Sequence, residues 1–490
     1  MITTFLGNYI DGAFRPVTHG ATFESVDPAT RDTVVLRAQA DLSAVESAAN
    51  AARRAASTWR RGGLNTRVDA LRKVQAKVSD HKERIAAAIT AEMGKPLVEA
   101  RIEAGSIAGK IEGVIGQLAH ELPTAHPGAP GEQRFHPLGV VGIIGPFNFP
   151  VHLLNTHVIP SLLVGNTIVA KPSEVTPLAG QRYAELFHDA GFPAGVLNVV
   201  HGLGPTGAAM VESRGIDGII FTGSYETGRR IRQATFERPE KKVCLELGGK
   251  NPAVVLDDAD LEQAVREIVL GALLTAGQRC TATSRVIVTP GIAEALQTRL
   301  VEAFSKVRPG DPKDEMTFMG PVATEASRQR FLASLGRLRD EGAEVLLESE
   351  ALDGGAYVTP SLYRVMGTEP SLHNEHFGPH VDLEVATDEA DAIARAAANP
   401  YGLSASLFSQ RRSALEDFYD AVRVGVLNFN RSTNGASGLL PFGGTGMSGN
   451  WMPAGSGAPR LGTFPVAMLQ AAYGARTPNA PLDRCLGADS

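Results

Sequence analysis

The sequence predicts an α/β protein that combines a doubly wound parallel sheet with a second α/β region. Between residues 139 and 221, short apolar runs alternate with helical patterns. The run Val140–Ile144 is apolar almost without interruption, as in a parallel strand that is covered on both faces. The alternation resumes between residues 251 and 435. Because 490 residues exceed what one ordinary core organises, we expect two or three domains.

Composition and charge argue against several classes of protein. Hydrophobic residues make up 43% of the chain and charged residues 20%, which is ordinary for a soluble globular protein. The net charge is −6 and no basic block stands out, so we expect no nucleic-acid partner and no membrane partner. The sequence shows neither a signal-peptide pattern nor an apolar run of membrane-spanning length.

The three cysteines, Cys244, Cys280 and Cys485, are too few and too scattered for a disulfide framework. This predicts a reducing compartment, the cytoplasm. The sequence contains no CxxC and no HExxH pattern, so we expect no metal site. His152 and His157 are spaced wrongly for one helix face, and we interpret both as structural.

The elements before residue 139 follow from local patterns. Tyr9–Phe14, with Asp-Gly between apolar positions, predicts a hairpin. Residues 42–120 have helical spacing, and Thr66–Glu92 predicts one long amphipathic helix with valine, leucine and isoleucine on its buried side. Residues 122–137 interrupt the helices with turn formers.

The later elements follow the alternation of strands and helices. We expect strands at residues 140–144, 167–170, 196–200, 218–221, 253–256 and 285–288, and helices at residues 179–190 and from Thr206. The stretch from about residue 461 to residue 490 is apolar at first and then polar. It fits an arm that packs on another subunit, and equally a loose tail.

Cys280 follows a strongly apolar helix pattern that begins at Asp260. Apolar residues recur along it at helical spacing, and Asp260 with Gln263 forms a capping box. Gly277 predicts the C-terminal end of this helix. The thiol of Cys280 would then have a fixed position, which a nucleophile needs. Taken alone, a single cysteine is more often a buried structural residue, so the rest of the chain must decide between these two roles.

Two glycine-rich loops each leave a strand and open a helix. Gly202–Gly207 matches G-x-G-x-x-G, but the next strand lacks the acidic residue of a dinucleotide fingerprint, so ordinary phosphate binding is not expected there. The loop at residues 221–228 is more suggestive, because its backbone N–H groups and the Ser224 hydroxyl suit a phosphate at a helix N-terminus. Alternatively, Ser224 is only an N-cap.

Lys171, Ser173 and Glu174 lie at the end of a predicted parallel strand, where open α/β sheets bind their ligands. A lysine and a glutamate at this edge can hold ribose hydroxyls. A carboxylate near an adenine ribose repels a 2′-phosphate, which favours NAD over NADP.

Six short motifs occur together in this chain. They are GPFNFP at residues 145–150, KPSE at 171–174, LELGGKNP at 245–252, GQRC at 277–280, EHFGP at 375–379 and PFGG at 441–444. In this order and spacing the set resembles the aldehyde dehydrogenase superfamily, and the resemblance covers nearly the whole chain. It implies that superfamily's fold, with a doubly wound parallel-sheet cofactor domain, an α/β catalytic domain and a small β oligomerisation arm.

The resemblance implies the catalytic roles. Cys280 is similar to the nucleophile, whose thiolate attacks an aldehyde carbonyl to give a thiohemiacetal and, after hydride transfer to NAD, a thioester. Asn148 matches the asparagine that forms an oxyanion hole with the Cys280 backbone N–H. Glu246 matches the general base that activates water for thioester hydrolysis. The alternative for Glu246 is a helix or turn cap, and Cys244 is interpreted as a core residue.

The resemblance also implies the NAD-binding residues. Glu375 matches the residue that holds the nicotinamide ribose, with a solvated loop acid as the alternative, and Phe377 packs near the ring. Lys171 and Glu174 match the adenosine-ribose contacts, and the loop Gly202–Gly207 lies near the adenine. The full predicted set is Lys171, Ser173, Glu174, Gly204, Gly223, Ser224, Gly228, Leu247, Glu375 and Phe377.

Within the superfamily, the chain most resembles the N-succinylglutamate 5-semialdehyde dehydrogenase branch of arginine catabolism. The ending Ser448–Asn450 is the most telling feature, and the match fades after it. A substrate with carboxylates needs cationic or N–H donors, and the candidates are Arg279, Arg431, Ser432 and Gly435. The alternative is that both arginines make structural ion pairs. Another semialdehyde or an aliphatic aldehyde stays open as the substrate.

The resemblance predicts an NAD-binding domain at residues 1–122 and 139–246, a catalytic domain at residues 247–460, and an oligomerisation arm at residues 123–138 and 461–490. It also implies a homodimer or homotetramer in which strand edges are covered by exchange. Two other functional classes stay open. One is a cofactor-independent cysteine thioesterase or esterase, and the other is a non-catalytic relative.

Overall fold

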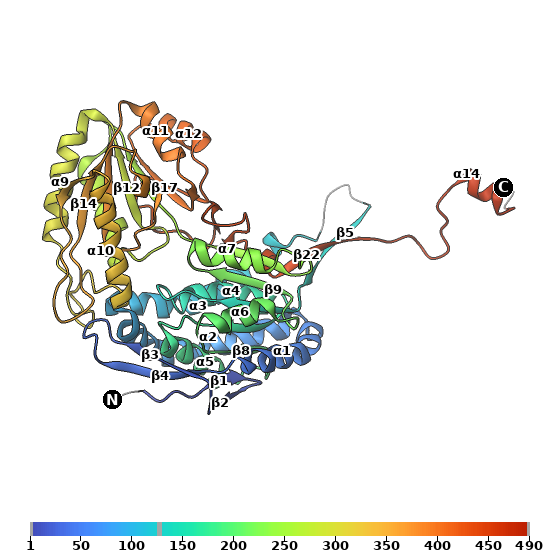
Figure 1. Cartoon of the computed structure of the whole chain (residues 1–490). Helices are drawn as coiled ribbons and strands as arrows, with labels where there is room; N and C mark the ends of the chain where they lie inside the picture. The colour runs from blue at the N-terminus through green and yellow to red at the C-terminus, as the bar shows by residue number, and fades with distance from the viewer. Residues whose placement is uncertain (1–2, 125–129, 488–490) are drawn as a thin grey trace.

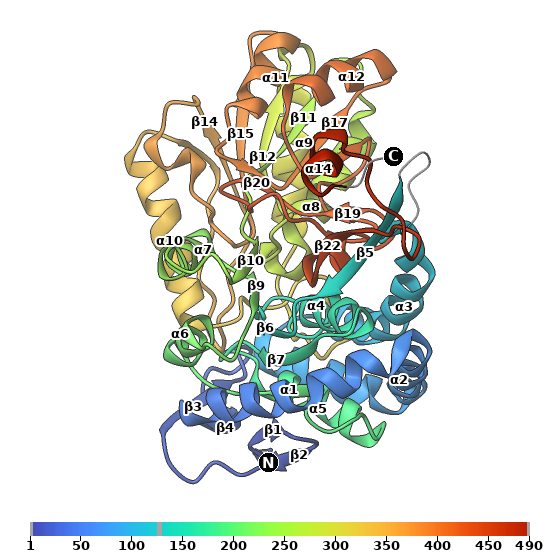
Figure 2. The same ribbon diagram turned by 90° about the vertical axis from the view of Figure 1, so that its right-hand side faces the viewer.

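The computed structural model describes residues 3–124 and 130–487, and it is built around two seven-stranded sheets. In Figure 1 the first sheet and its helices form the lower part of the molecule, and the second sheet with its helices forms the upper part. A long ribbon that leads into the C-terminal tail extends away from both parts (Figure 1), and Figure 2 shows the molecule from the side to which this ribbon extends. The predicted α/β class is confirmed.

The first sheet has the strand order β10-β9-β6-β7-β8-β1-β2. The first five strands are parallel, β1 is antiparallel to β8, and β2 is antiparallel to β1. In that order, the strands span Lys242–Glu246, Gly218–Thr222, Val140–Ile144, Thr167–Lys171, Leu197–Val199, Asn8–Ile10 and Ala13–Arg15. From β6 the chain proceeds through β7 and β8, and it then returns to the other side of β6 as β9. This reversal creates a crevice beyond the carboxyl ends of β6 and β9.

Helices cover both faces of this sheet because its central strands are apolar on both sides. In β6, Val141 and Ile143 belong to the core with α2, α4 and α5, whereas Val140 and Ile144 belong to the core with α1 and α6. The helices are α1 (Ser43–Arg61), α2 (Gly63–Met93), α3 (Leu97–Glu121), α4 (His152–Leu163), α5 (Pro177–Asp189), α6 (Gly204–Glu212) and α7 (Tyr225–Ala234). The long helix predicted at Thr66–Glu92 lies within α2.

The other local predictions for this part of the chain are also confirmed. β1 and β2 form a hairpin, and Asp11 (φ 54°) and Gly12 (φ 78°) both adopt the left-handed conformation that a two-residue type I′ turn requires. The four strands predicted between residues 140 and 221 correspond to β6, β7, β8 and β9.

The second sheet has the order β13-β14-β15-β12-β11-β17-β18, and only its edge strand β13 is antiparallel to its neighbour. In that order, the strands span Glu344–Leu347, Ser361–Val365, His380–Val385, Thr283–Val288, Asn251–Val255, Ser404–Phe408 and Val426–Phe429. Its helices are α8 (Leu261–Leu273), α9 (Ala293–Lys306), α10 (Glu325–Asp340), α11 (Glu389–Ala397) and α12 (Arg412–Ala421). The predicted strands at 253–256 and 285–288 correspond to β11 and β12.

Shorter elements complete the described chain. They are the strand pairs β3 (Ala21–Val26) with β4 (Val34–Ala40), β16 (Tyr401–Gly402) with β20 (Thr445–Gly446) and β19 (Pro441–Phe442) with β21 (Ala454–Gly455), the helix α13 (Ala458–Leu461) and the 3₁₀ turns η1 (Leu274–Gly277), η2 (Pro290–Ile292) and η3 (Pro370–His373). Among the described residues, no helix combines the length and the apolar character needed to cross a membrane.

The projecting ribbon pairs β5 (Gly131–Pro137) with β22 (Thr463–Leu469) in antiparallel register, followed by a tail and α14 (Ala480–Cys485). The turn formers at 122–137 therefore include a strand. Several large apolar side chains of the ribbon and tail are exposed, namely Phe464, Val466, Leu469, Tyr473, Leu482 and Leu486. Residues 125–129 and 488–490 of the predicted arm lie outside the described residues. The predicted division into domains stays a prediction.

β10 is an edge strand of the first sheet, and the C-terminal segment of the chain covers its open side. The Leu245 N–H donates to Asn450 Oδ1 (2.9 Å), and Asn450 Nδ2 donates to the Val243 carbonyl (2.8 Å). Lys242 Nζ donates to the carbonyl of Thr463 (2.9 Å), where β22 begins. The Ser448–Asn450 ending is therefore attached to the strand that carries Glu246, and it satisfies backbone groups that an open edge would expose.

Candidate active site

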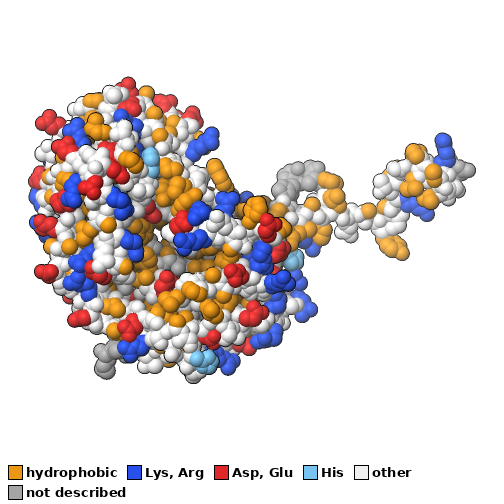
Figure 3. All heavy atoms as spheres, in the orientation of Figure 1, with side chains coloured by type: hydrophobic (Ala, Val, Ile, Leu, Met, Phe, Trp, Pro, Cys, Tyr) orange, Lys and Arg blue, Asp and Glu red, His pale blue; other side chains and the backbone are white. Residues whose placement is uncertain are grey.

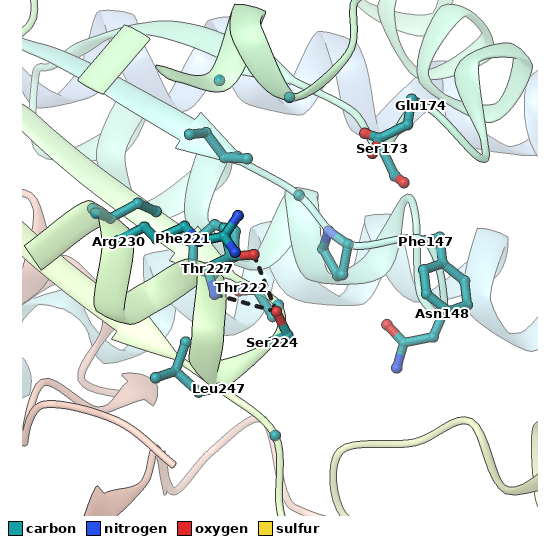
Figure 4. Close-up of a pocket in the computed structure, with 18 of the residues that line it drawn as sticks. Phe147, Asn148, Ser173, Glu174, Phe221, Thr222, Ser224, Thr227, Arg230 and Leu247 are labelled. Carbon is teal, nitrogen blue, oxygen red and sulfur yellow. Dashed lines mark hydrogen bonds between the residues drawn. The ribbon is translucent and has the colours of Figure 1, made fainter. Parts of the chain in front are cut away.

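A cavity of about 680 Å³ lies beyond the carboxyl ends of β6, β7 and β9, at the reversal of strand order. On the face seen in Figure 3 the surface is hollowed between the upper and the lower part of the molecule. In Figure 4, Ser173 and Glu174 lie on one side of the cavity, on the same side of the view as Phe147 and Asn148. Ser224 and Leu247 lie on the other side. Cys280 also lines the cavity, so the predicted nucleophile and the predicted nucleotide loops share one space.

Of the ten residues predicted to bind the cofactor, all except Gly228 line this cavity. Gly228 lies one turn into α7, where a Cβ would come within 2.6 Å of the Leu247 side chain. Glycine at this position thus lets the helix pack closely on Leu247, which does line the cavity. Sequence reasoning did not single out Thr227, Arg230, Ser327 or Arg330, although all four also line the cavity.

Ser224 is the N-cap of α7, and its Oγ accepts a hydrogen bond from the Thr227 N–H (3.3 Å). The N-cap interpretation is therefore correct, but it does not exclude the other one, because the same residue lines the cavity. At the opposite wall, the buried Lys171 Nζ lies 3.1 Å from the exposed carboxylate of Glu174. This ion pair orients the carboxylate at the end of β7.

The turn that carries Cys280 differs from the expected helix end. α8 begins after the N-cap Asp260, whose side chain accepts from the Gln263 N–H, as predicted. The helix ends at Leu273 rather than at Gly277, because Thr275, Ala276 and Gly277 all have positive φ (57°, 52° and 70°). A threonine in this conformation is strained, so other contacts must hold the turn.

Glu99, on α3, supplies those contacts. Its carboxylate accepts from the Thr275 N–H (3.2 Å) and from the Thr275 hydroxyl (2.7 Å). The same carboxylate accepts from the Arg279 guanidinium (2.6 Å), and Arg279 Nε donates to Thr275 Oγ1 (3.0 Å). Arg279 therefore braces the turn through a structural ion pair, which was the alternative to its predicted role in substrate binding.

Glycine and asparagine fix the backbone on both sides of Cys280. A Cβ on Gly277 would collide with the Gly378 carbonyl oxygen, so this position requires glycine for space as well as for its φ of 70°. Asn251, at the start of β11, donates from Nδ2 to the carbonyls of Cys280 (2.8 Å) and Ala282 (2.9 Å). The sulfur is thus held by the second sheet while it faces a cavity that belongs mainly to the first.

Asn148 is buried, and its Nδ2 donates to the Gln278 carbonyl (2.9 Å), two residues before Cys280. The loop that carries Asn148 rests on a buried ion pair between Lys95 and Glu103. Lys95 Nζ also donates to the Asn148 carbonyl (2.6 Å), and Glu103 accepts from the Val151 N–H (3.0 Å). Sequence reasoning missed this pair, since nothing near Lys95 in the sequence indicates that it reaches residue 148.

Glu246 is the last residue of β10, and it is buried with 3% of its side chain exposed. Its Oε2 lies 3.5 Å from His157 Nε2 of α4. Burial raises the pKa of the Cys280 thiol to about 12, and the charges of Glu246 and Glu375 add to that effect. The backbone N–H groups of Thr281 and Cys280 act in the opposite direction, because they favour the thiolate.

Glu375 and Phe377 lie on a loop next to the Leu247–Lys250 turn. The Gly249 N–H donates to Glu375 Oε1 (3.0 Å), and burial raises the pKa of this carboxyl to about 7. Phe377 has a φ of 54° and meets Phe147 edge to face, with ring centroids 5.8 Å apart. The second sheet thereby contributes an acid and an aromatic ring to the cavity.

His376, His380 and Asp382 place three possible metal ligands within 4.8 Å of one another, beneath this loop. The ammonium of Lys250 lies 2.7 Å from Asp382, and all four side chains are buried. A cation would have to displace this ammonium, so the cluster is a charge network that supports residues 375–377. The sequence patterns used to exclude metal sites do not detect such a cluster.

The remaining substrate candidates lie outside the cavity. Arg431 is exposed, and its guanidinium donates to the Gly435 carbonyl (3.3 Å). Ser432 is buried, and its N–H donates to Glu267 (2.8 Å). This loop nevertheless approaches the nucleophile, because Thr281 Oγ1 donates to Asn434 Oδ1 (2.7 Å).

Comparison with known proteins identifies the family. The model of the aldehyde dehydrogenase family matches residues 14–458. The chain belongs to the aldehyde dehydrogenase family. Members of this family oxidise aldehydes to carboxylic acids, and this chain is an enzyme of that kind.

Relatives and solved structures of this family match nearly the whole chain. N-succinylglutamate 5-semialdehyde dehydrogenases from Burkholderia thailandensis and Vibrio cholerae are each 38% identical, over 95% and 92% of this chain and 96% and 94% of the relatives. Lactaldehyde dehydrogenase from Escherichia coli has a TM-score of 0.89 at 32% identity and covers 94% of this chain and 99% of its own. Aldehyde dehydrogenase C from Pseudomonas syringae, solved with NAD⁺ and octanal, has a TM-score of 0.90 at 30% identity, covering 94% and 96%. The aldehyde dehydrogenase fold is thereby confirmed.

Proposed function

We propose that this enzyme oxidises N-succinylglutamate 5-semialdehyde to N-succinylglutamate with NAD. The observation that carries the reaction is the meeting of Cys280, Asn148 and Glu375 in one cavity. The relatives from Burkholderia thailandensis and Vibrio cholerae, which bear the name of this activity, support the substrate. Neighbouring structures with NAD bound, including 1-pyrroline-5-carboxylate dehydrogenase from Thermus, support the cofactor.

The residues of the cavity fit a dinucleotide. Glu174 and Glu375 come from different sheets and offer carboxylate acceptors for the hydroxyls of two riboses. Arg230 and the backbone N–H groups at the start of α7 suit the phosphates between them. When bound, NAD accepts the hydride that leaves the aldehyde carbon.

Three residues of the chain perform the remaining chemistry. The Cys280 thiol releases its proton to solvent, the sulfur attacks the aldehyde carbon, and a thioester on this sulfur follows the oxidation. One N–H of Asn148 Nδ2 is held by Gln278, which leaves the second N–H, together with the Cys280 backbone N–H, for the oxygen that becomes negative. Glu246 removes a proton from the water that hydrolyses the thioester.

The substrate is tested by an NADH-formation screen. The aldehydes are N-succinylglutamate semialdehyde, glutamate semialdehyde, succinate semialdehyde and an aliphatic aldehyde, and we expect the highest kcat/KM for the first. A higher kcat/KM for any other aldehyde contradicts the proposed substrate. Without NAD the aldehydes should give no acid. Hydrolysis of an ester or thioester without NAD, at a higher kcat/KM than the oxidation of any aldehyde in the screen, would instead favour a cysteine hydrolase.

Within this proposal, Arg431 binds a carboxylate of the substrate, because it is exposed on the loop that reaches Thr281. Replacing Arg431 with Met should raise KM for a dicarboxylic semialdehyde about tenfold and leave KM for an aliphatic aldehyde unchanged. Arg412→Met, at an exposed arginine of α12, is the control. An unchanged KM for both aldehydes removes Arg431 from the proposal.

NAD affinity should fall as the solution becomes more acidic. The pKa of Glu375 is raised to about 7, so this carboxyl is protonated below that pH and ionised above it. Because an ionised carboxylate is the better acceptor for ribose hydroxyls, the dissociation constant of NAD should rise about tenfold between pH 8 and pH 6. Glu375→Gln should bind NAD weakly with little pH dependence, whereas Glu174→Gln should keep the pH dependence. Fluorescence titration measures both, and a wild-type affinity that is constant across this range contradicts the role of Glu375.

We further propose that the protein is a homodimer or homotetramer that assembles through β5 and β22. The exposed apolar residues on this projecting ribbon support that assignment. Light scattering on Val466→Asp should show a smaller assembly than the wild type. The three cysteines are unpaired thiols, which supports the reducing cytoplasm as the location.

A further inference from the structure

His157 lies in the middle of α4, in a stretch where every residue from Leu153 to Leu163 is buried. Only 2% of its side chain is exposed. Its Nε2 points to two groups on neighbouring strands of the first sheet, Thr222 Oγ1 on β9 at 3.2 Å and Glu246 Oε2 on β10 at 3.5 Å. The sequence reasoning that paired His157 with His152 considered only one helix face and therefore missed the contact across to β10.

The surroundings of Glu246 make this contact unusual. Among the described residues, neither carboxylate oxygen of Glu246 has a hydrogen-bond partner, and His157 Nδ1 has none either. Burying a carboxylate without donors is costly, and an imidazole that carries a proton on Nε2 relieves that cost. Within the part of the chain that the structure describes, the imidazole of His157 is thus the basic group within ion-pair distance of the Glu246 carboxylate.

Other charged groups near this pair come from three directions. Lys110 of α3 acts electrostatically on Glu246, but its Nζ donates to the Gly455 carbonyl at 3.2 Å. His152, on the same helix as His157, is engaged with Ser106 Oγ at 2.9 Å, and Glu103 accepts from backbone N–H groups at residues 151 and 152. The Cys280 thiol lies within electrostatic range of Glu246 on the cavity side.

We propose that His157 is a positioning residue for Glu246 and shares the proton that Glu246 takes up during thioester hydrolysis. This inference rests on the proposed function. The water oxygen bonds to the thioester carbon, and one water proton moves to the Glu246–His157 pair, while the other stays on the product acid. When the C–S bond breaks, its electron pair stays on the Cys280 sulfur, which then receives the shared proton. The products are a carboxylic acid and the free thiol.

The kinetic test separates acylation from hydrolysis in His157→Gln, which keeps a hydrogen-bond donor but cannot take up a proton. We expect a burst of NADH equal to the wild-type burst, followed by a steady-state rate that is at least about tenfold lower. At saturating NAD, the pH profile of that rate between pH 6 and pH 8 should differ from the wild-type profile. A wild-type steady-state rate and pH profile, or a burst that disappears in a folded variant, overturns the proposal.

The control for this test is His81→Gln. His81 is also a buried histidine facing a carboxylate, with its Nε2 3.1 Å from Asp189, but it lies between α2 and α5. Its replacement should leave both the burst and the steady-state rate unchanged. A reduced steady-state rate in His81→Gln as well would show that loss of any buried histidine has this effect, and it would overturn the specific role of His157.

A second readout needs neither substrate nor NAD. Infrared difference spectra between a protein and its Glu246→Gln variant isolate the Glu246 carboxyl group. Because the imidazole lies 3.5 Å from Glu246 Oε2, we expect the frequency of this carboxyl band at pH 7 to differ between the wild-type and the His157→Gln background. The same band in both backgrounds overturns the proposal. If no aldehyde gives NADH with the wild type, the proposed function fails, and the infrared comparison still decides the role of His157.

Discussion

Replacing Asn148 with alanine is expected to lower kcat by about 10²–10³-fold and to leave the affinity for NAD unchanged. The Gln278 carbonyl holds one N–H of the Asn148 amide at 2.9 Å, so the direction of the second N–H is fixed before any substrate arrives. Lys95 and Glu103 hold the backbone of the same loop. Such a preorganised donor stabilises developing negative charge without rearranging during the reaction, which is why its loss affects kcat more than binding.

Steady-state kinetics and NAD titration measure the two quantities separately. Asn65→Ala, at an exposed asparagine of α2, is the control and should match the wild type. The thermal unfolding curve of Asn148→Ala should also stay close to that of the wild type, which excludes a general loss of structure. A variant that loses NAD affinity while retaining kcat would assign Asn148 to the cofactor instead of the oxyanion.

Replacing Glu99 with alanine should destabilise the protein by about 3 kcal/mol and abolish most of the activity. The side chains of Glu99 and Arg279 are only 13% and 18% exposed, so the substitution leaves a largely buried guanidinium without its partner. It also removes the two hydrogen bonds that Glu99 accepts from Thr275, whose backbone is in the left-handed conformation. Cys280 is five residues further along, and its position should become heterogeneous.

A chain of this size often unfolds irreversibly, so the half-life of inactivation at a fixed temperature is the practical measurement. The double variant Glu99→Ala/Arg279→Met should lose less stability than the sum of the losses in the two single variants, because each single change leaves the other charged side chain without its partner. Glu315→Ala breaks an exposed pair with Arg101 on the same helix as Glu99 and should leave the half-life unchanged. Additive effects in the double variant would show that the two side chains act independently.

Local patterns were sufficient for the elements of the fold. Val140–Ile144 shows the reason. A strand covered on both faces is apolar at every position, and such a run can be recognised in the sequence without knowing which elements pack against it. Asp11-Gly12 is similar, because the turn geometry selects the residues directly. The motifs around Cys280, Asn148 and Glu375 likewise sufficed to predict residues that share a cavity.

Contacts between distant residues account for what was missed. Sequence reasoning predicts the end of α8 at Gly277. It misses the strained turn at Thr275, because this turn depends on Glu99, which lies 176 residues away in the chain. His157 was interpreted as structural because its relevant neighbour, Glu246, belongs to another element. No periodicity of one helix reports on such a contact, and the same holds for Lys95 and the Asn148 loop.

The C-terminal cover of β10 gives the projecting ribbon a mechanical connection to the catalytic base. One side of β10 is bonded to β9, and the other side is bonded to Asn450 and, through Lys242, to the start of β22. A force on the ribbon, such as the proposed binding of another subunit, would therefore act on the strand that carries Glu246. Under the proposed assembly through β5 and β22, we therefore expect assembly and turnover to be linked. Shortening the chain at its C-terminus should change hydrolysis of the thioester before it changes the cofactor cavity.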